Sequence, residues 1–213
     1  MLAYLSWHRA AAGVERSAYE QALERFHRSL AHRPPSGFRG SSAFRLSELP
    51  WLAPVAGAEP AAGYEDWYLL DDWTAVGVLE EAAVARGHLT AHDAIAGVAG
   101  CATGSVYRLV EGHARSRAEE VDSSARPGGL DAGAADTAIW VKRTPGHEHP
   151  SLGALLGDGM DRERDGLWRR CIGLGPAPEY CLLAGEPAAG VAASRLPAGW
   201  VAHAIERAVV WDG

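Results

Sequence analysis

Alternating polar side chains near the start of the chain have the residue types that acid/base chemistry needs. Between Leu2 and Arg9 the sequence runs Ala3, Tyr4, Leu5, Ser6, Trp7 and His8. Alternate side chains of a β-strand point to opposite faces, so Tyr4, Ser6 and His8 share one face. Histidine titrates near neutral pH and can exchange a proton with a ligand. A phenol and a hydroxyl beside it can orient a small aromatic or keto substrate.

Two residues from later strands extend this set. His203 lies on the alternating face of the last predicted strand, from which it could reach the same cavity. Tyr68 lies in a predicted strand over 65–71, and which of its faces meets the cavity depends on a register that the sequence does not reveal. The predicted site consists of catalytic His8 and Tyr68 and ligand-binding Tyr4, Ser6 and His203.

The position of this site follows from the apolar face of the first strand. We expect a helix layer to cover Ala3, Leu5 and Trp7, which leaves the polar face and His8 in a space between two sheets. The alternative is that His8 is a strand-end residue hydrogen-bonded to solvent or backbone, with the space between the sheets packed by side chains.

The other histidines do not predict a metal site. His88 and His92 are four residues apart, but a helix capped by Thr90 would leave His88 outside the helix, and a zinc or iron site needs further ligands. His147 and His149 fall in a predicted loop, where their spacing suits a metal less well than it would on a strand. We therefore expect no metal site.

Composition and motifs exclude several classes of protein. The net charge of −7 disfavours nucleic acid and anionic membranes as partners, and the arginines around Trp168 alternate with acidic residues, which is typical of a solvated surface. No apolar run is long enough to span a membrane, and no signal peptide is expected. The three cysteines (Cys101, Cys171 and Cys181) predict free thiols in a reducing compartment, the cytoplasm. Nucleotide-binding, P-loop, nucleophile-elbow and zincin motifs are absent from the sequence.

The elements that would position the site alternate between strand and helix patterns. We predict strands over 2–9, 38–46, 65–71 and 104–112 and helices over 17–33, 74–87 and 90–98. Ser17 and Glu20 have the spacing of a capping box, and Asp72 is a candidate cap for the second helix. Residues 114–136 lack an apolar period and predict a linker or mobile excursion. Strands over 137–143, 179–184 and 200–211 and an interrupted helix over 152–172 follow.

This order of elements resembles the ferredoxin-like β-α-β-β-α-β unit, and the chain as a whole is similar to the dimeric α/β-barrel superfamily. The segment Glu65 to Trp73 is the most family-like. The resemblance implies an α+β fold of two ferredoxin-like halves, with antiparallel sheets packed face to face as an α/β barrel. The halves would be residues 1–113 and a shortened unit over 137–213, joined by 114–136.

The same resemblance leaves the chemistry open, because the superfamily includes cofactor-free monooxygenases, haem-dependent enzymes and isomerases. It implies a soluble protein with a small-molecule cavity between two sheets and cofactor-free oxygenase or isomerase-like chemistry. The alternative is a module that binds a small molecule or mediates association without turnover. No cofactor is expected, with haem as the second option. The eight tryptophans leave room for a homodimer.

Overall fold

The computed structural model describes residues 1–53, 63–85, 87–112, 136–143, 146, 166–173, 175, 177–183, 196 and 198–213. The described strands are β1 (Leu2–Ala10), β2 (Phe38–Leu46), β3 (Gly63–Leu70), β4 (Ala99–Gly112), β5 (Asp136–Arg143), β6 (Gly166–Gly173), β7 (Tyr180–Leu183) and β8 (Trp200–Asp212). The described helices are α1 (Arg16–His32), α2 (Trp73–Ala83) and α3 (Leu89–Ala96). None of these three helices combines the length and the apolar character that a membrane span requires.

The eight strands form one closed barrel in the order β1-β3-β2-β8-β5-β7-β6-β4, and every pairing is antiparallel. Within the first half the order is β4-β1-β3-β2, and within the second half it is β8-β5-β7-β6. The two sets join where β2 pairs with β8 and β4 pairs with β6. The expected α+β class and the expected antiparallel barrel are therefore confirmed, and the strand sets of the two halves are continuous with each other around this barrel.

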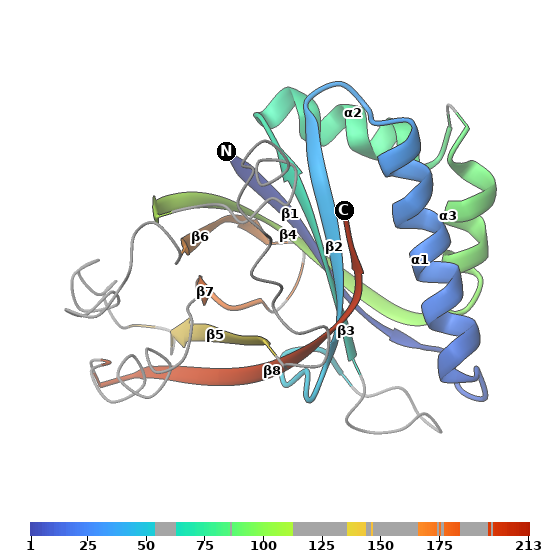
Figure 1. Ribbon diagram of the computed structural model, residues 1–213. Helices are drawn as coiled ribbons and strands as arrows, with labels where there is room; N and C mark the ends of the chain where they lie inside the picture. The colour runs from blue at the N-terminus through green and yellow to red at the C-terminus, as the bar shows by residue number, and fades with distance from the viewer. Residues whose placement is uncertain are drawn as a thin grey trace, which may run out of the picture.

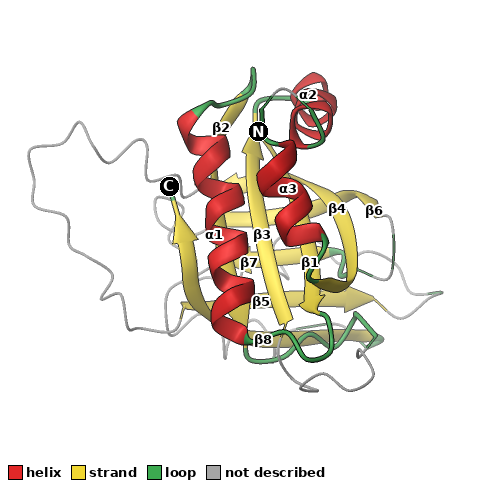
Figure 2. Cartoon of the chain, turned by 90° about the vertical axis from the view of Figure 1, so that its right-hand side faces the viewer, coloured by secondary structure: helices red, strands yellow, loops and turns green. Residues whose placement is uncertain are grey.

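The described helices all lie outside the barrel on one side (Figure 1). In the perpendicular view, α1 and α3 run side by side in front of β3 and β1 (Figure 2), and they contact each other directly. A stripe of α1 residues at helical spacing is buried against this side: Tyr19, Ala22, Leu23, Phe26, His27 and Leu30. Strands β1 and β3 are consequently buried on two faces, by the helices outside and by the barrel interior within.

The barrel interior is packed with aromatic side chains rather than open. Trp7, Trp140 and Trp168 are at most 1% exposed. The Trp7 ring centroid lies 5.3 Å from that of Trp140, and Trp67 lies 5.4 Å from Trp168, both in edge-to-face contact. Each such pair stabilises the fold by about 0.5–1.5 kcal/mol beyond the area that it buries. The interior of the barrel is therefore hydrophobic core.

The packing reverses the predicted faces of β1. Ala3, Leu5 and Trp7 point into the barrel interior and belong to its core cluster, whereas we expected helices to cover them. Tyr4 packs against the cluster beneath the helices, and His8 contacts Tyr19 of α1. The large indole and leucine side chains fill the barrel, and the polar face is covered by the helix layer.

Several local predictions are also corrected. Helix α1 begins at Arg16 with Glu15 at its N-cap and no side-chain cap, so the Ser17–Glu20 capping box does not form. Helix α3 has His88, not Thr90, at its N-cap. Residues 166–172, expected within a helix, lie in strand β6, where they pair with β4 and β7. The cap at Asp72 is confirmed, because its side chain accepts a hydrogen bond from the Ala75 amide.

Candidate active site beneath the helix layer

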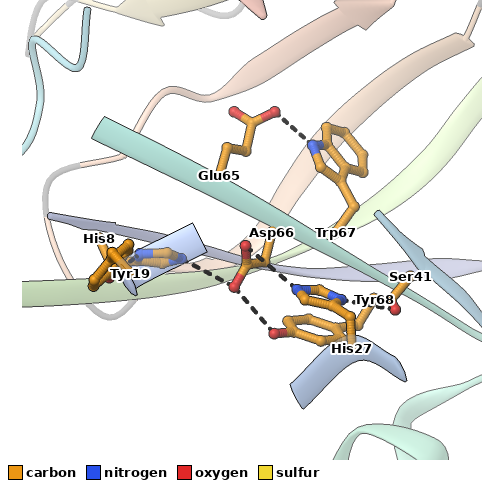
Figure 3. A network of polar contacts seen from close by, with 8 residues as sticks. All are labelled: His8, Tyr19, His27, Ser41, Glu65, Asp66, Trp67 and Tyr68. Carbon is orange, nitrogen blue, oxygen red and sulfur yellow. Dashed lines mark hydrogen bonds and ion pairs between the residues drawn. The ribbon is translucent and has the colours of Figure 1, made fainter. Parts of the chain in front are cut away.

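The carboxylate of Asp66 is the centre of a buried polar network on the helix-facing side of β3 (Figure 3). Its Oδ2 atom lies 3.0 Å from His8 Nε2 and accepts a hydrogen bond from the Tyr68 hydroxyl at 3.1 Å. Its neighbour Glu65 points the opposite way, into the barrel, where it accepts hydrogen bonds from the indole nitrogens of Trp7 at 2.9 Å and Trp67 at 2.6 Å. Asp66 and Glu65, which are adjacent in β3, therefore lie in different environments, one facing the helices and the other the barrel interior.

Strand register explains why these polar residues meet. Directly opposite residues of an antiparallel pair share a face, and the β1–β3 register places Tyr4 opposite Tyr68 and Ser6 opposite Asp66. His8 is opposite Tyr64, and their rings stack with centroids 5.6 Å apart and an angle of 7°. The register therefore assembles the polar face from both strands.

Helix α1 contributes a phenol to His8. The second ring nitrogen, Nδ1, lies 2.6 Å from the Tyr19 hydroxyl oxygen. Asp66 can only accept hydrogen bonds when ionised, so a neutral His8 that donates from Nε2 to Asp66 must accept a hydrogen bond from the Tyr19 hydroxyl at Nδ1. The result is a hydroxyl–imidazole–carboxylate chain, Tyr19–His8–Asp66, in which the carboxylate fixes the tautomer and orientation of the imidazole.

A second histidine approaches Asp66 from the other side. His27 Nε2 lies 3.5 Å from Asp66 Oδ1, and His27 Nδ1 lies 2.8 Å from the Ser41 hydroxyl. The His27 ring stacks on Tyr68 with centroids 5.1 Å apart and an angle of 2°. His27 is fully buried and does not line the cavity described below, so it acts on the site through Asp66.

The surroundings separate the protonation states of these groups. Burial alone would raise the pKa of Asp66, but His8 and His27 beside it hold that pKa well below its usual range. Burial, together with the nearby Asp66 charge, raises the pKa values of Tyr19 and Tyr68 well above their ordinary values. At neutral pH the network therefore holds one carboxylate anion and two protonated phenols.

A cavity of about 210 Å³ lies between this network and the helices. Its polar lining residues are Tyr4, Ser6, His8, Tyr19, Asp66, Tyr68, Glu80 and His92. Its apolar lining residues are Leu23, Phe26, Leu79, Ala83, Ile95, Ala96, Ala99 and Ala102. An apolar cavity of about 150 Å³ accommodates benzene, so this one has room for a molecule of one or two rings.

The structure brings together four of the five residues predicted from the sequence. Tyr4, Ser6, His8 and Tyr68 all line this cavity, although it lies beneath the helices and not between two sheets. His203 is elsewhere: it is half-buried on β8, with its ring 6.4 Å from that of Trp51 in the barrel core. The pair His147 and His149 lies outside the described residues.

Sequence reasoning missed Tyr19 and His27 as site residues. A signal was present, because Tyr19, Leu23, Phe26 and Leu30 recur in the sequence at helical spacing, and His27 lies four residues after Leu23 on the same face. A histidine within an apolar stripe is a candidate for a buried polar contact. Asp66 lies in the predicted strand over 65–71, but its partners depend on a strand register that the sequence does not reveal.

The described residues do not fit a haem. The barrel interior is filled by indole rings, and the cavity beneath the helices is smaller than the roughly 300–1,000 Å³ of drug-sized ligand pockets. The ring nitrogens of His8 already face Tyr19 and Asp66. Within the described part of the chain, no three histidine, cysteine, aspartate or glutamate side chains are grouped to hold a metal ion.

Comparisons with known proteins add little to this geometry. No protein-family model matches the chain, and no curated protein matches it. Among solved structures, an anthrone oxidase-like protein is 10% identical, with a TM-score of 0.49 and coverage of 97% of this chain and 90% of the other. A chlorite dismutase-like protein is 12% identical, with a TM-score of 0.48 and coverage of 98% and 95%. Similarities this low do not show a function for this chain.

Proposed function

We propose that the cavity beneath the helices binds a small, mostly apolar molecule and that the Tyr19–His8–Asp66 chain exchanges a proton with it. The observation that carries this proposal is that a complete hydroxyl–imidazole–carboxylate chain lines a cavity whose remaining walls are largely apolar. Perturbed titratable groups in a cavity are typical of functional sites, and a structural role alone would not require a cavity beside them.

The proton transfer balances within the described residues. The Tyr19 oxygen receives a proton from an acidic C–H or O–H group of the ligand while its own proton passes to His8 Nδ1. Asp66 stabilises the resulting imidazolium because its carboxylate lies 3.0 Å from Nε2. Return of the proton to another ligand atom completes an isomerisation and needs no cofactor. Cofactor-free oxygenase chemistry would use the same deprotonation, with dioxygen as a second substrate.

The architecture supports a finer proposal about the fold. The strands of the first half lie in the spatial order β4-β1-β3-β2, and those of the second half in the order β8-β5-β7-β6. When the strands of each half are numbered along the chain, both halves have the same spatial order: fourth, first, third, second. We propose that they are related ferredoxin-like units of a dimeric α/β-barrel protein, joined through 114–136. The three cysteines are free, which supports the proposed cytoplasmic location, and a homodimer remains part of the proposal.

The test is exchange of ligand protons. β-Tetralone, a bicyclic ketone with acidic C–H groups, is incubated with the protein in deuterium oxide and followed by NMR. We expect the wild type to accelerate deuterium incorporation and Tyr19→Phe to lose about 100-fold of that acceleration, the usual contribution of a positioned acid/base group. Tyr180→Phe, a buried tyrosine in a different core cluster, is the matched control and should retain it.

The outcomes separate the candidate functions. Binding of β-tetralone without accelerated exchange would favour the non-catalytic binding module over the enzyme. Equal exchange by wild type and Tyr19→Phe would show that the hydroxyl–imidazole–carboxylate chain does not carry the proton.

A further inference from the structure

The distribution of charge around the cavity restricts the ligands that it can accept. None of the described residues that line the cavity is an arginine or a lysine, and two of them, Asp66 and Glu80, are carboxylates. The Asp66 charge is already engaged by two histidines and Tyr68. Glu80, on α2, is exposed and lines the cavity, so its carboxylate is the second negative group beside the cavity. A carboxylate or phosphate ligand would meet repulsion from the carboxylates and no arginine or lysine to pair with.

Aromatic rings contribute the second feature of the cavity. The Tyr4 and Tyr68 rings are stacked with centroids 6.0 Å apart. Phe26 lies 6.4 Å from Tyr68 and 5.7 Å from His92, edge to face in each case. All four residues line the cavity. The face of a tyrosine or phenylalanine ring carries negative potential and attracts organic cations, whereas it gives an anion no stabilisation.

Glu80 is a neighbour of Tyr4, one of these four aromatic residues. Burial raises the pKa of Tyr4 to about 12, and the neighbouring Glu80 carboxylate contributes to that shift. The Tyr4 hydroxyl is therefore protonated at neutral pH, and Glu80 is the negative group at this end of the cavity. A cation held between them would contact both a carboxylate and an aromatic face.

We propose that the ligand of this cavity is an organic ammonium ion with a small apolar, aromatic body, and that Glu80 binds its charge. The proposal rests on the proposed function in one respect, that this cavity is the ligand site. The apolar wall formed by Leu23, Leu79 and Ile95 would receive the body of the ligand, and the aromatic residues and Glu80 would select its charge.

Three probes that share a phenyl ring and a short side chain test the selection: phenethylamine, phenethyl alcohol and phenylacetate. Phenethylamine is cationic at neutral pH because an aliphatic amine has a pKa near that of lysine, about 10. Titration calorimetry with the full chain should show phenethylamine binding about tenfold more tightly than phenethyl alcohol, the size expected from one cation–π contact and one partly exposed ion pair. Phenylacetate should bind most weakly.

The variant Glu80→Gln isolates the carboxylate. We expect it to weaken phenethylamine binding about fivefold and to leave phenethyl alcohol binding unchanged. Glu81→Gln makes the same change of charge one residue along α2, at a residue that does not line the cavity, and should leave the preference intact.

The results distinguish failure of the ammonium proposal from failure of the proposed function. If phenethyl alcohol binds as tightly as phenethylamine, or if Glu80→Gln retains the full preference, the ammonium proposal is overturned while the cavity remains a binding site. If all three probes and β-tetralone fail to bind, the proposed function itself is overturned.

Discussion

Replacement of Asp66 by asparagine tests whether its charge organises the buried network. Asparagine keeps the shape of the side chain but removes the negative charge that faces His8 at 3.0 Å and His27 at 3.5 Å. An amide oxygen at the position of Oδ2 can still accept from both Tyr68 and His8, so the change replaces charged hydrogen bonds with neutral ones and creates no cavity. The loss in stability therefore measures the electrostatic contribution alone.

The expected magnitude follows from the two hydrogen bonds to Asp66 Oδ2. A hydrogen bond to a charged group contributes about 1.5–3 kcal/mol and a neutral one about 0.5–1.5 kcal/mol. The difference, about 1 kcal/mol for each bond, gives a loss of about 2 kcal/mol in the free energy of unfolding. For a chain of this size, that loss lowers the Tm by about 4–8 °C.

The pH dependence of stability is a second, independent test of the role of Asp66. The pKa of Asp66 is lower in the folded state than in the unfolded chain, so its charge stabilises the fold above the unfolded value near pH 4. That contribution is lost as the pH falls below about 4 toward the folded value. The stability difference between wild type and Asp66→Asn should therefore shrink on acidification through this range.

Thermal unfolding followed by circular dichroism measures both effects. Asp71→Asn is the matched control, because Asp71 makes an exposed ion pair with Arg39 and should change the Tm little. If Asp66→Asn and Asp71→Asn lower the Tm equally, or if the Asp66→Asn difference is independent of pH below about 4, Asp66 is not the charged centre of the network.

Two further predictions concern the cavity and the core. A Cβ atom at Gly104 would lie 2.7 Å from the Tyr4 hydroxyl oxygen. Gly104→Ala should therefore push the phenol toward the cavity and abolish the binding of phenethyl alcohol, as measured by calorimetry. The control Gly77→Ala, where the added atom meets nothing within 4 Å, should bind phenethyl alcohol normally. Trp140→Ala should lower the free energy of unfolding by about 3–5 kcal/mol in denaturant titrations, since it empties the centre of the barrel core; a loss below about 1 kcal/mol would mean that this core is not tightly packed.

The strands and helices of the first half could be predicted because their patterns are local. The expected strand over 38–46 matches β2, and the Asp72 cap begins α2 as predicted. The predicted segment Leu152–Ile172 shows the limit. Its apolar residues Leu167 and Trp168 fit a helix as well as a strand, and pairing with β4 and β7 makes residues 166–172 a strand. Long-range pairing of this kind has no local signal.

The site shows the same division between pattern and placement. Alternation correctly grouped Tyr4, Ser6 and His8 on one face. It could not tell which face lies inside, because β1 is buried on both sides and either face could have met the helices. Partners from other elements, such as Tyr19 and Asp66, depend on helix docking and on the β1–β3 register. Those tertiary contacts determine the chemistry of His8.

The pairing of β2 with β8 has a consequence for biosynthesis. The Ser42 side chain donates to Asp212 at 2.8 Å across 170 positions of sequence, so the ribosome must synthesise and expose the chain through Asp212 before the barrel can close. Until then, β2 has an unpaired edge that can recruit strands from other nascent chains. Slow closure is also expected, since distant contacts form late. The protein should consequently depend more on chaperones during synthesis than its compact final form would suggest.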